Sequence, residues 1–373
     1  MFEICLMKVL FIGEFSNVHF HLKEALESLG HEVLLVTNDG GWRKYYSDLQ
    51  ITRKSGSLIH TLSYLLSLSG ILPKLKGFDV VQINNPAHFF QLKASRNLQI
   101  YNYLKKHNKK IFLAGYATDY YWVKSCLEDG IFRYSEFKIG EQLIDSRYNL
   151  EQIHEWMHTE KKNVNIEIAE TCNGIPCCLY EYFKAYQQYF PDKATFIPLP
   201  INMDSLSFEK KGSIQKKIKF FIGIQKEKNE LKGTDIMLRA LQKLQLKYPE
   251  EIEILKAESV PYHEYQQMMD GSDIILDQLY SYTPSMNSLI AMAKGLVVVG
   301  GGEPENYAII NETELRPIIN VLPSEEDVFN KLEWLVLNKE EIPRLSRESI
   351  EYVKKHHYHI QVAKQYLEFW ESK

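Results

Sequence analysis

Residues 8–37, KVLFIGEFSNVHFHLKEALESLGHEVLLVT, indicate the fold class of this chain. An apolar run is closed by Gly13, and apolar residues then recur at helical spacing until Gly30 stops the pattern. A second apolar run follows and ends at Thr37. The order strand, helix, strand predicts that the two strands are parallel neighbours in one sheet.

The same alternation continues along the chain. We predict further strands at 78–83, 110–114, 194–198, 218–225, 251–256, 272–277, 296–300 and 317–322. Helices are predicted between them, including 234–246 with Thr234 as its cap, 261–269, 284–294, 324–337 and a last helix near 360–369. The residues from Pro200 to Lys217 hold prolines, serines and lysines with little apolar period, as is typical of a linker.

These patterns predict an α/β protein with two doubly wound, Rossmann-like domains. The predicted boundaries are 1–200 for the first domain, 201–217 for the linker, 218–350 for the second domain and 351–373 for a terminal helix. A length of 373 residues exceeds what one ordinary hydrophobic core supports and suits two.

Composition excludes several classes of protein. Hydrophobic residues at 45% and charged residues at 25% are ordinary for a folded chain and argue against disorder. The net charge of −4 provides no general attraction for nucleic acid. Five cysteines without a secretory leader indicate reduced thiols in the cytoplasm, and the group Cys172, Cys177 and Cys178 lacks the spacing of a zinc site. No metal is predicted.

The apolar stretch 58–75 is interrupted by serines, Gly70 and Pro73, so it is too short for a membrane span. Contact of this stretch with a membrane surface remains open. A location at the inner face of the membrane is therefore compatible with the expected cytoplasmic one.

Ligands of doubly wound sheets bind beyond the carboxyl ends of the strands, where we find the candidate residues. The first loop, 13–17, lacks the GxGxxG fingerprint, which weakens an oxidoreductase interpretation. Lys232 stands at a predicted helix start, where it is either a phosphate ligand or a solvated turn lysine.

Two further strand-end loops are candidates. Pro284 suits the first turn of a helix, whose first backbone amides have no partner within the helix. These amides and the side chains of Ser285, Asn287 and Ser288 could bind a diphosphate or ribose. Alternatively, the side chains merely cap the helix. The glycine run 300–302 permits close approach of a ligand. Glu303 and Glu305 after it either accept hydrogen bonds from sugar hydroxyls or favour the positive end of the next helix.

Several segments resemble glycosyltransferase family 4, particularly members that build bacterial surface polysaccharides. They include MKVLFIGEFSNVHFHLKEALESLGHEVLLVTNDGGW (7–42), FDVVQINNP (78–86), AGYATDYYWVK (114–124), FIPLPIN (196–202), KGTD (232–235), SDIILDQ (272–278) and AMAKGLVVVGG (291–301). The resemblance implies the GT-B fold, with a nucleotide-diphosphate sugar in the second domain, an acceptor in the first and the two facing across a cleft. It also implies that the last helix returns to the first domain, and it favours retention of configuration.

The resemblance assigns roles residue by residue. Lys232 matches the family's diphosphate-binding lysine, while its companion arginine has no match and Gln225 or Lys226 occupies the neighbourhood. The family's paired glutamates read Tyr282 and Ile290 here, so the donor is held differently or the protein is a degenerate member. Alternatively, Asn287 and Glu305 supply replacements for the two glutamates.

Asp119 is the candidate that orients or deprotonates the acceptor hydroxyl; alternatively, it caps the helix beginning near residue 120. Lys232 is the second catalytic candidate, since it would neutralise the departing diphosphate without a metal. Gly13 is a further donor-binding candidate, and weaker acceptor candidates are Glu14, Asn17, His19, His88 and Tyr120.

The predicted function is transfer of a sugar from a nucleotide-diphosphate donor to a hydroxyl of a glycan or lipid-linked acceptor, with no cofactor. A nucleotide-binding scaffold descended from a transferase is the alternative, supported by the missing glutamates. A GT-B-shaped epimerase or phosphorylase is a further rival class.

Overall fold

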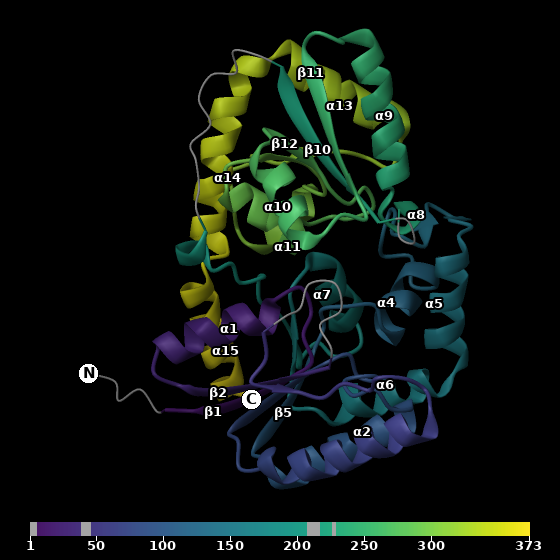
Figure 1. The fold of residues 1–373 in the computed structure, drawn as a ribbon, viewed down its shortest axis with the longest axis vertical. Coiled ribbons are helices and arrows are strands. Elements are labelled where there is room, and N and C mark those ends of the chain that lie inside the picture. The colour runs from purple at the N-terminus through teal and green to yellow at the C-terminus, as the bar shows by residue number, and fades with distance from the viewer. Residues whose placement is uncertain (1–5, 39–45, 207–216, 226–228) are drawn as a thin grey trace. The chain divides into compact units, whose positions relative to one another are not determined.

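The computed structural model describes residues 6–38, 46–206, 217–225 and 229–373, and it divides into two compact units. Unit 1 comprises Met1–Val123, Ile153–Pro200 and His359–Lys373, and unit 2 comprises Lys124–Gln152 and Ile201–Tyr358. Figure 1 labels the helices and strands of both.

Unit 1 is built on a five-stranded sheet of order β3-β2-β1-β4-β5, and all its pairings are parallel. The strands are β1 (Lys8–Ile12), β2 (Glu32–Thr37), β3 (Leu49–Gln50), β4 (Val80–Asn84) and β5 (Lys110–Ala114). Val9 pairs with Val33 on one side and with Val80 on the other, so β1 lies where the strand order reverses.

Helices and a small second sheet complete unit 1. Its helices, two of which continue into unit 2, are α1 (Val18–Ser28), α2 (Leu58–Ile71), α3 (Ala94–His107), α4 (Tyr120–Leu127), α5 (Arg147–His158), α6 (Glu160–Thr171), α7 (Tyr180–Gln187) and α15 (His359–Ser372). The strands β8 (Ile175–Cys177) and β9 (Ala194–Phe196) pair in parallel.

Unit 2 repeats the design with a parallel sheet of order β11-β10-β12-β13-β14. The strands are β10 (Ile218–Ile224), β11 (Ile252–Glu258), β12 (Ile274–Leu276), β13 (Val297–Gly300) and β14 (Ile319–Asn320), with a hairpin of β6 (Lys138–Ile139) and β7 (Gln142–Leu143). Its helices are α8 (Asn229–Lys232), α9 (Thr234–Lys247), α10 (Tyr262–Asp270), α11 (Met286–Ala293), α12 (Pro304–Ile309), α13 (Glu325–Leu337) and α14 (Ile342–His356).

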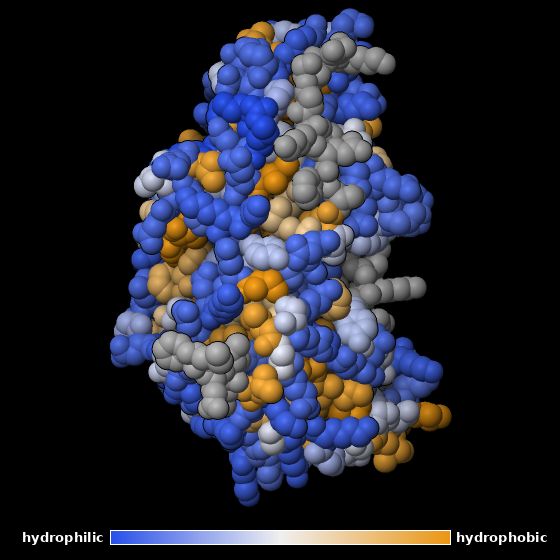
Figure 2. All heavy atoms as spheres, turned by 90° about the vertical axis from the view of Figure 1, so that its left-hand side faces the viewer, coloured by the Kyte–Doolittle hydropathy of each residue, from blue (hydrophilic) through white to orange (hydrophobic). Residues whose placement is uncertain are grey.

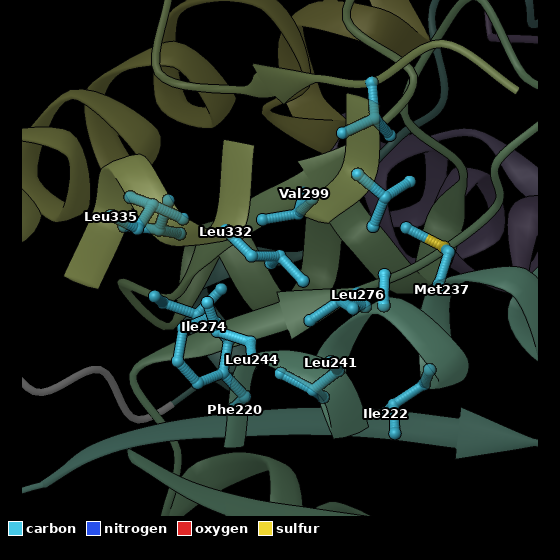
Figure 3. Packing of buried hydrophobic residues seen from close by; sticks show 14 of the residues in the cluster. Phe220, Ile222, Met237, Leu241, Leu244, Ile274, Leu276, Val299, Leu332 and Leu335 are labelled. Atoms are coloured by element: carbon cyan, nitrogen blue, oxygen red, sulfur yellow. The ribbon is translucent and has the colours of Figure 1, made fainter. Parts of the chain in front are cut away.

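The core of unit 2 follows from the apolar periods of its strands and helices. Phe220 and Ile222 of β10 and Met237, Leu241 and Leu244 of α9 are fully buried in one cluster, which Figure 3 shows from close by. Residues three or four apart on α9 lie on one helical face, and alternate residues of β10 lie on one face of the sheet. Burial of this apolar surface therefore holds the helix against the sheet.

The α/β class and the two doubly wound sheets are confirmed, while some details differ from the predictions. Gly233, in the left-handed region at φ 65°, occupies the N-cap position of α9 in place of Thr234, whose hydroxyl donates to the Asn229 carbonyl. Lys124–Gln152 group with unit 2, although the predicted boundary placed them in the first domain. Most of the predicted linker lies outside the described residues.

The surface shown in Figure 2 is mostly hydrophilic, with smaller apolar patches between the polar side chains. Such mixing is normal for the surface of a globular protein. Among the described helices, none combines the length and the apolar character that crossing a membrane requires.

Candidate functional site

The loop between β12 and α11 organises the carboxyl edge of the unit 2 sheet. Asp277, directly after β12, is 5% exposed, and one of its carboxylate oxygens accepts hydrogen bonds from both the Ser285 and Ser288 hydroxyls, at 2.8 and 2.7 Å. Two predicted donor-binding serines are thus tied to a buried carboxylate. Their bonds fix the start of α11 relative to the end of β12.

The start of α11 presents unpaired backbone donors. Ser285 is the N-cap residue with an extended backbone, and no side chain caps the helix in the described structure. The first amides of a helix have no partner within it, and the helix dipole adds positive potential at that end. Together these groups form a local environment suited to an anion, with Asn287 in the first turn.

Lys232 lies beside the same loop. The Leu279 amide donates to the Lys232 carbonyl at 2.8 Å, and Gly233 packs so closely that a Cβ there would lie 2.6 Å from the Leu279 Cβ. No acidic group of the described residues lies within 4.0 Å of the Lys232 ammonium. Gln225 is exposed at the end of β10, and Lys226 lies outside the described residues.

The glycine run at the end of β13 packs against the same loop. A Cβ on Gly300 would lie 2.2 Å from the Asp277 carbonyl oxygen, and one on Gly301 would lie 2.3 Å from that of Ser281. The close approach predicted for a ligand is thus made by the chain's own backbone. The glycines allow the strand end and the loop to pack together.

Glu303 and Glu305 are engaged by a segment from the first half of the sequence. Arg133 forms ion pairs with both glutamates, and the Tyr134 hydroxyl donates to Glu303 at 2.6 Å. Asn320 also donates to Glu303, which is 5% exposed. Arg133 lowers the pKa of Glu305, whose side chain is 25% exposed.

Tyr282 stands where the resemblance expects a glutamate, and it anchors the same segment. Its hydroxyl accepts the Arg133 amide at 2.7 Å, its ring stacks on Tyr134 and the Arg133 guanidinium lies over its face. Tyr282 is 2% exposed. Ile290, on α11, is the second substitution.

A second group of candidates surrounds a pocket of about 250 Å³ in unit 1. The pocket lies at the carboxyl ends of β1, β2 and β4, around the point where the strand order reverses. Its described lining is Gly13, Glu14, Phe15, Thr37, Asn38, Asn84, Asn85, His88, Phe89 and Ala117. Gly13, Glu14 and His88 were predicted from the sequence.

Glu14 turns back onto the first turn of α1. Its carboxylate accepts the amides of Phe15, His19 and Phe20 at 2.7, 3.2 and 2.9 Å. Burial raises the pKa of Glu14 to about 7, against the amide hydrogen bonds, which lower it. The α1 start therefore already holds a carboxyl group.

The remaining acceptor candidates of unit 1 lie outside the pocket lining. His19 is 1% exposed, with hydrogen bonds to the Gly13 carbonyl and to Gln82, and burial lowers its pKa to about 4. Asn17 is the N-cap of α1, in the left-handed region at φ 66°. Tyr120 is 7% exposed, and its amide donates to Asn165.

Asp119 caps helix α4, which confirms the second of the two roles predicted for it. It is 2% exposed, one carboxylate oxygen accepts the Trp122 amide at 3.0 Å and the other accepts the Tyr186 hydroxyl at 2.6 Å. Burial raises its pKa to about 6, in a range where carboxylates act as bases. A role in acceptor chemistry remains a prediction.

Cys126, Cys172, Cys177 and Cys178 are buried and form no disulfide among the described residues. Within the described ranges, no group of three or more His, Cys, Asp or Glu side chains is arranged to hold a metal ion.

Several polar residues at strand ends were not predicted as site residues from the sequence. Thr37, Asn38, Asn84 and Asn85 follow β2 and β4 and line the unit 1 pocket. Asparagine placed directly after a predicted strand was the available signal, because those positions meet at one edge of a parallel sheet. Arg133 had no such signal, since it lies in an irregular segment far in sequence from Glu303 and Glu305, with which it pairs.

No model of a known protein family and no curated protein sequence matches this chain, whereas many solved structures do. The catalytic domain of starch synthase IV from Arabidopsis thaliana, bound to ADP and acarbose, matches with a TM-score of 0.59 and 10% identity over 98% of this chain and 99% of its own. HepE from Anabaena in complex with UDP-glucose matches with a TM-score of 0.58 and 11% identity, over 98% of this chain and 100% of its own.

A protein from Listeria monocytogenes described as a UDP-N-acetylglucosamine 2-epimerase also matches, with a TM-score of 0.55 and 12% identity over 98% of this chain and 95% of its own. At such identities the likeness concerns the fold, which enzymes of more than one reaction class share. The two parallel sheets, their strand orders and these matches show that the chain has the GT-B fold.

Proposed function

We propose that this protein is a glycosyltransferase that moves a hexose from a nucleoside-diphosphate sugar, bound by unit 2, to a hydroxyl of an acceptor bound by unit 1. One observation carries the proposal. The loop 277–285 bonds to the backbone of Lys232, and Asp277 in it bonds to the serines at the α11 start, so the lysine that has no acidic partner among the described residues and the free helix amides are both anchored to one loop. Such a combination suits a diphosphate.

The chemistry that follows needs little covalent participation by the protein. Bond cleavage at the anomeric carbon leaves negative charge on the diphosphate, which the Lys232 ammonium and the α11 amides would stabilise. Positioning of the acceptor hydroxyl supplies the rest of the rate. Metal independence, retention of configuration and a role for Asp119 in orienting or deprotonating the hydroxyl belong to this proposal.

The donor class is supported by the structural matches. HepE was solved with UDP-glucose and starch synthase IV with ADP, both of which contain the nucleoside diphosphate that the unit 2 edge suits. Gln225, Asn287, Glu303 and Glu305 of unit 2 complete the proposed donor contacts, with Lys226, which lies outside the described residues. Glu305 is the more accessible of the two glutamates, because its side chain is 25% exposed against 6% for Glu303.

The test is donor consumption by the full-length protein. A panel of UDP-, ADP- and GDP-hexoses is offered with glucose, maltose and a polyprenyl-linked sugar as acceptors, and the released nucleoside diphosphate and glycosylated product are measured. The proposal expects both products in equal amounts. An altered sugar nucleotide without nucleotide release would instead identify an epimerase.

The second candidate is a nucleotide-binding scaffold without turnover. It is favoured by the cluster around Tyr282, in which the tyrosine and both nearby glutamates are bonded to the segment 133–134. Binding of a nucleoside diphosphate without release from any donor would support this candidate over the transferase.

We further propose that the acceptor is a glycan or lipid-linked sugar of polysaccharide biosynthesis, at the cytoplasmic face of a membrane. Helix α2 exposes a run of apolar side chains, among them Leu58 at 88% and Leu66 at 65%. An exposed apolar helix face suits an interfacial contact. Co-sedimentation with anionic vesicles should fall when Leu62, on the same helix, is replaced by glutamate.

A further inference from the structure

The unit 1 pocket contains buried polar side chains that have no partner in the protein. Asn84 is 5% exposed and Thr37 is 3% exposed, and in the described structure neither the Asn84 amide oxygen nor the Thr37 hydroxyl has a hydrogen-bond partner. The amide oxygen of Asn38 is also buried without a partner. Buried polar groups are normally paired, so unpaired ones lining a pocket indicate that a ligand completes them.

The chemistry of these groups restricts the ligand. A carboxamide and a hydroxyl both donate and accept hydrogen bonds, and so does each hydroxyl group of a sugar. The pocket of about 250 Å³ is close to the lower end of the size range of small-molecule sites. It suits a compact group that presents several hydroxyls.

The charges of the described residues around the pocket disfavour an anion. None of its described lining residues is a lysine or arginine. The α1 amides, which would otherwise attract a phosphate, already bind the Glu14 carboxylate. Burial lowers the pKa of His88, and the neighbouring Lys161 lowers it further while itself pairing with Glu155.

We propose that the pocket selects a neutral, hydroxyl-rich ligand and that the acceptor of the transfer reaction ends in an uncharged sugar, with phosphorylated and acidic sugars rejected. The inference rests on the proposed function only in identifying the ligand of this pocket as the acceptor of the reaction. The selection itself depends only on unit 1, with Asn84 and Thr37 as hydrogen-bonding groups and Glu14 as the occupant of the α1 start.

The experiment compares matched sugars on the full-length protein without nucleotide. Glucose, N-acetylglucosamine and maltose are titrated by saturation-transfer NMR beside glucose 6-phosphate and glucuronic acid. At least one neutral sugar should bind, and its charged counterpart should bind at least about tenfold more weakly. Equal or tighter binding of the charged sugars, or binding of no neutral sugar, would overturn the proposal.

Two substitutions assign the binding to this pocket. Asn84→Ala and the nearly isosteric Thr37→Val should each weaken neutral-sugar binding by about fivefold, the loss expected for one or two neutral hydrogen bonds. Asn102→Ala, an exposed position on α3, is the matched control and should change nothing. Sugar binding unaffected by both pocket variants would place the ligand elsewhere and contradict the inference.

A third variant tests the role of Glu14. Glu14→Gln removes the charge and should narrow the difference in affinity between glucose and glucose 6-phosphate. Glu32→Gln, at an exposed ion pair on β2, is the control and should leave this difference unchanged. An unchanged difference in Glu14→Gln would show that this carboxylate has no part in the selection.

Nucleotide binding separates this inference from the proposed function. Transfer from a sugar nucleotide to an acidic acceptor would overturn the inference and leave the function standing. Selective neutral-sugar binding by a protein that binds no nucleoside diphosphate would overturn the function and leave the inference about the pocket standing.

Discussion

Asp119 shows how one buried carboxylate affects both stability and the search for a catalytic group. Its folded-state pKa of about 6 lies above the ordinary value of 3.8 because burial disfavours the charge. Its contribution to the free energy of unfolding is therefore fully present below pH 3.8 and is lost as pH rises through about 6. At neutral pH the buried charge therefore lowers the free energy of unfolding of the wild-type protein.

Asp119→Asn should consequently gain stability relative to the wild type between about pH 4 and pH 8. Urea denaturation of both proteins at these two pH values measures the change. A constant difference would show that the pKa of Asp119 is not raised.

Turnover of the same variant tests the catalytic prediction, because loss of a general base lowers the rate by about 100-fold or more, while loss of a cap does not.

The glycines after β13 lead to a second prediction at this scale. Gly300→Ala would put a Cβ 2.2 Å from the Asp277 carbonyl oxygen, which is backbone and has little freedom to move. We expect unit 2 to lose about 1–3 kcal/mol of unfolding free energy. Gly70→Ala is the control, since nothing lies within 4 Å of its Cβ and helix propensity should stabilise it by about 0.5–1 kcal/mol. Equal effects of the two changes would contradict the packing explanation.

Individual residues could be predicted where local chemistry decides their place. The alternative cap role of Asp119 was found because aspartate before a helix is a local signal. The hydrogen bonds of Ser285 and Ser288 to Asp277 could not be predicted, because they depend on how a strand end and a helix start meet in space.

At the scale of elements, the segment Phe132–Tyr134 closes part of the carboxyl edge of the unit 2 sheet. Arg133 forms two ion pairs and a cation–π contact there, and Tyr134 bonds to the buried Glu303. These contacts bind Lys124–Gln152 to a sheet formed from residues beyond 217.

Arg133→Ala should lower the unfolding free energy of unit 2 by about 1–3 kcal/mol, because Glu303 is 6% exposed and would lose a charged partner. Hydrogen exchange of residues 124–152 should accelerate. Arg147→Ala is the matched control on an exposed pair with Glu151 and should stay within about 0.5 kcal/mol. A result for Arg133 that equals this control would mean that the ion pairs contribute no measurable stability.

The elements with strong periodicity were predictable, and those set by tertiary contact were not. The prediction at 110–114 coincides with β5, and those at 234–246 and 324–337 nearly coincide with α9 and α13. The hairpin β6–β7 and the two-residue strand β3 carry almost no period of their own. Their pairing partners determine them, which a single sequence does not display.

At the scale of the whole molecule, the last helix belongs to the unit built by the start of the chain. Helix α15 lies in unit 1 with Trp370 and Tyr366 fully buried, and the Trp370 ring contacts Phe11 of β1. Trp370→Ala should cost unit 1 about 3–5 kcal/mol. Trp370→Phe should cost much less, because the indole N–H has no partner in the described structure. Chemical denaturation followed by unit 1 hydrogen exchange measures both, and equal costs would contradict this packing.

The sequence indicated two units but not which residues each contains. Alternating strand and helix patterns reveal a sheet wherever they occur, so both sheets were predicted. Membership of Lys124–Gln152 depends on contacts such as that of Ile144 with the unit 2 core. Contacts of this kind between distant segments have no local signature.

The central claim is that nucleoside diphosphates bind at the carboxyl edge of the unit 2 sheet, against Lys232 and the α11 amides. It is tested most directly by calorimetric titration of the wild type, Lys232→Ala and the exposed control Lys331→Ala with UDP, ADP and GDP. We expect one of these nucleotides to bind the wild type and the control equally and to bind Lys232→Ala about tenfold or more weakly. Equal affinity of all three proteins, or no binding of any nucleoside diphosphate, would contradict it.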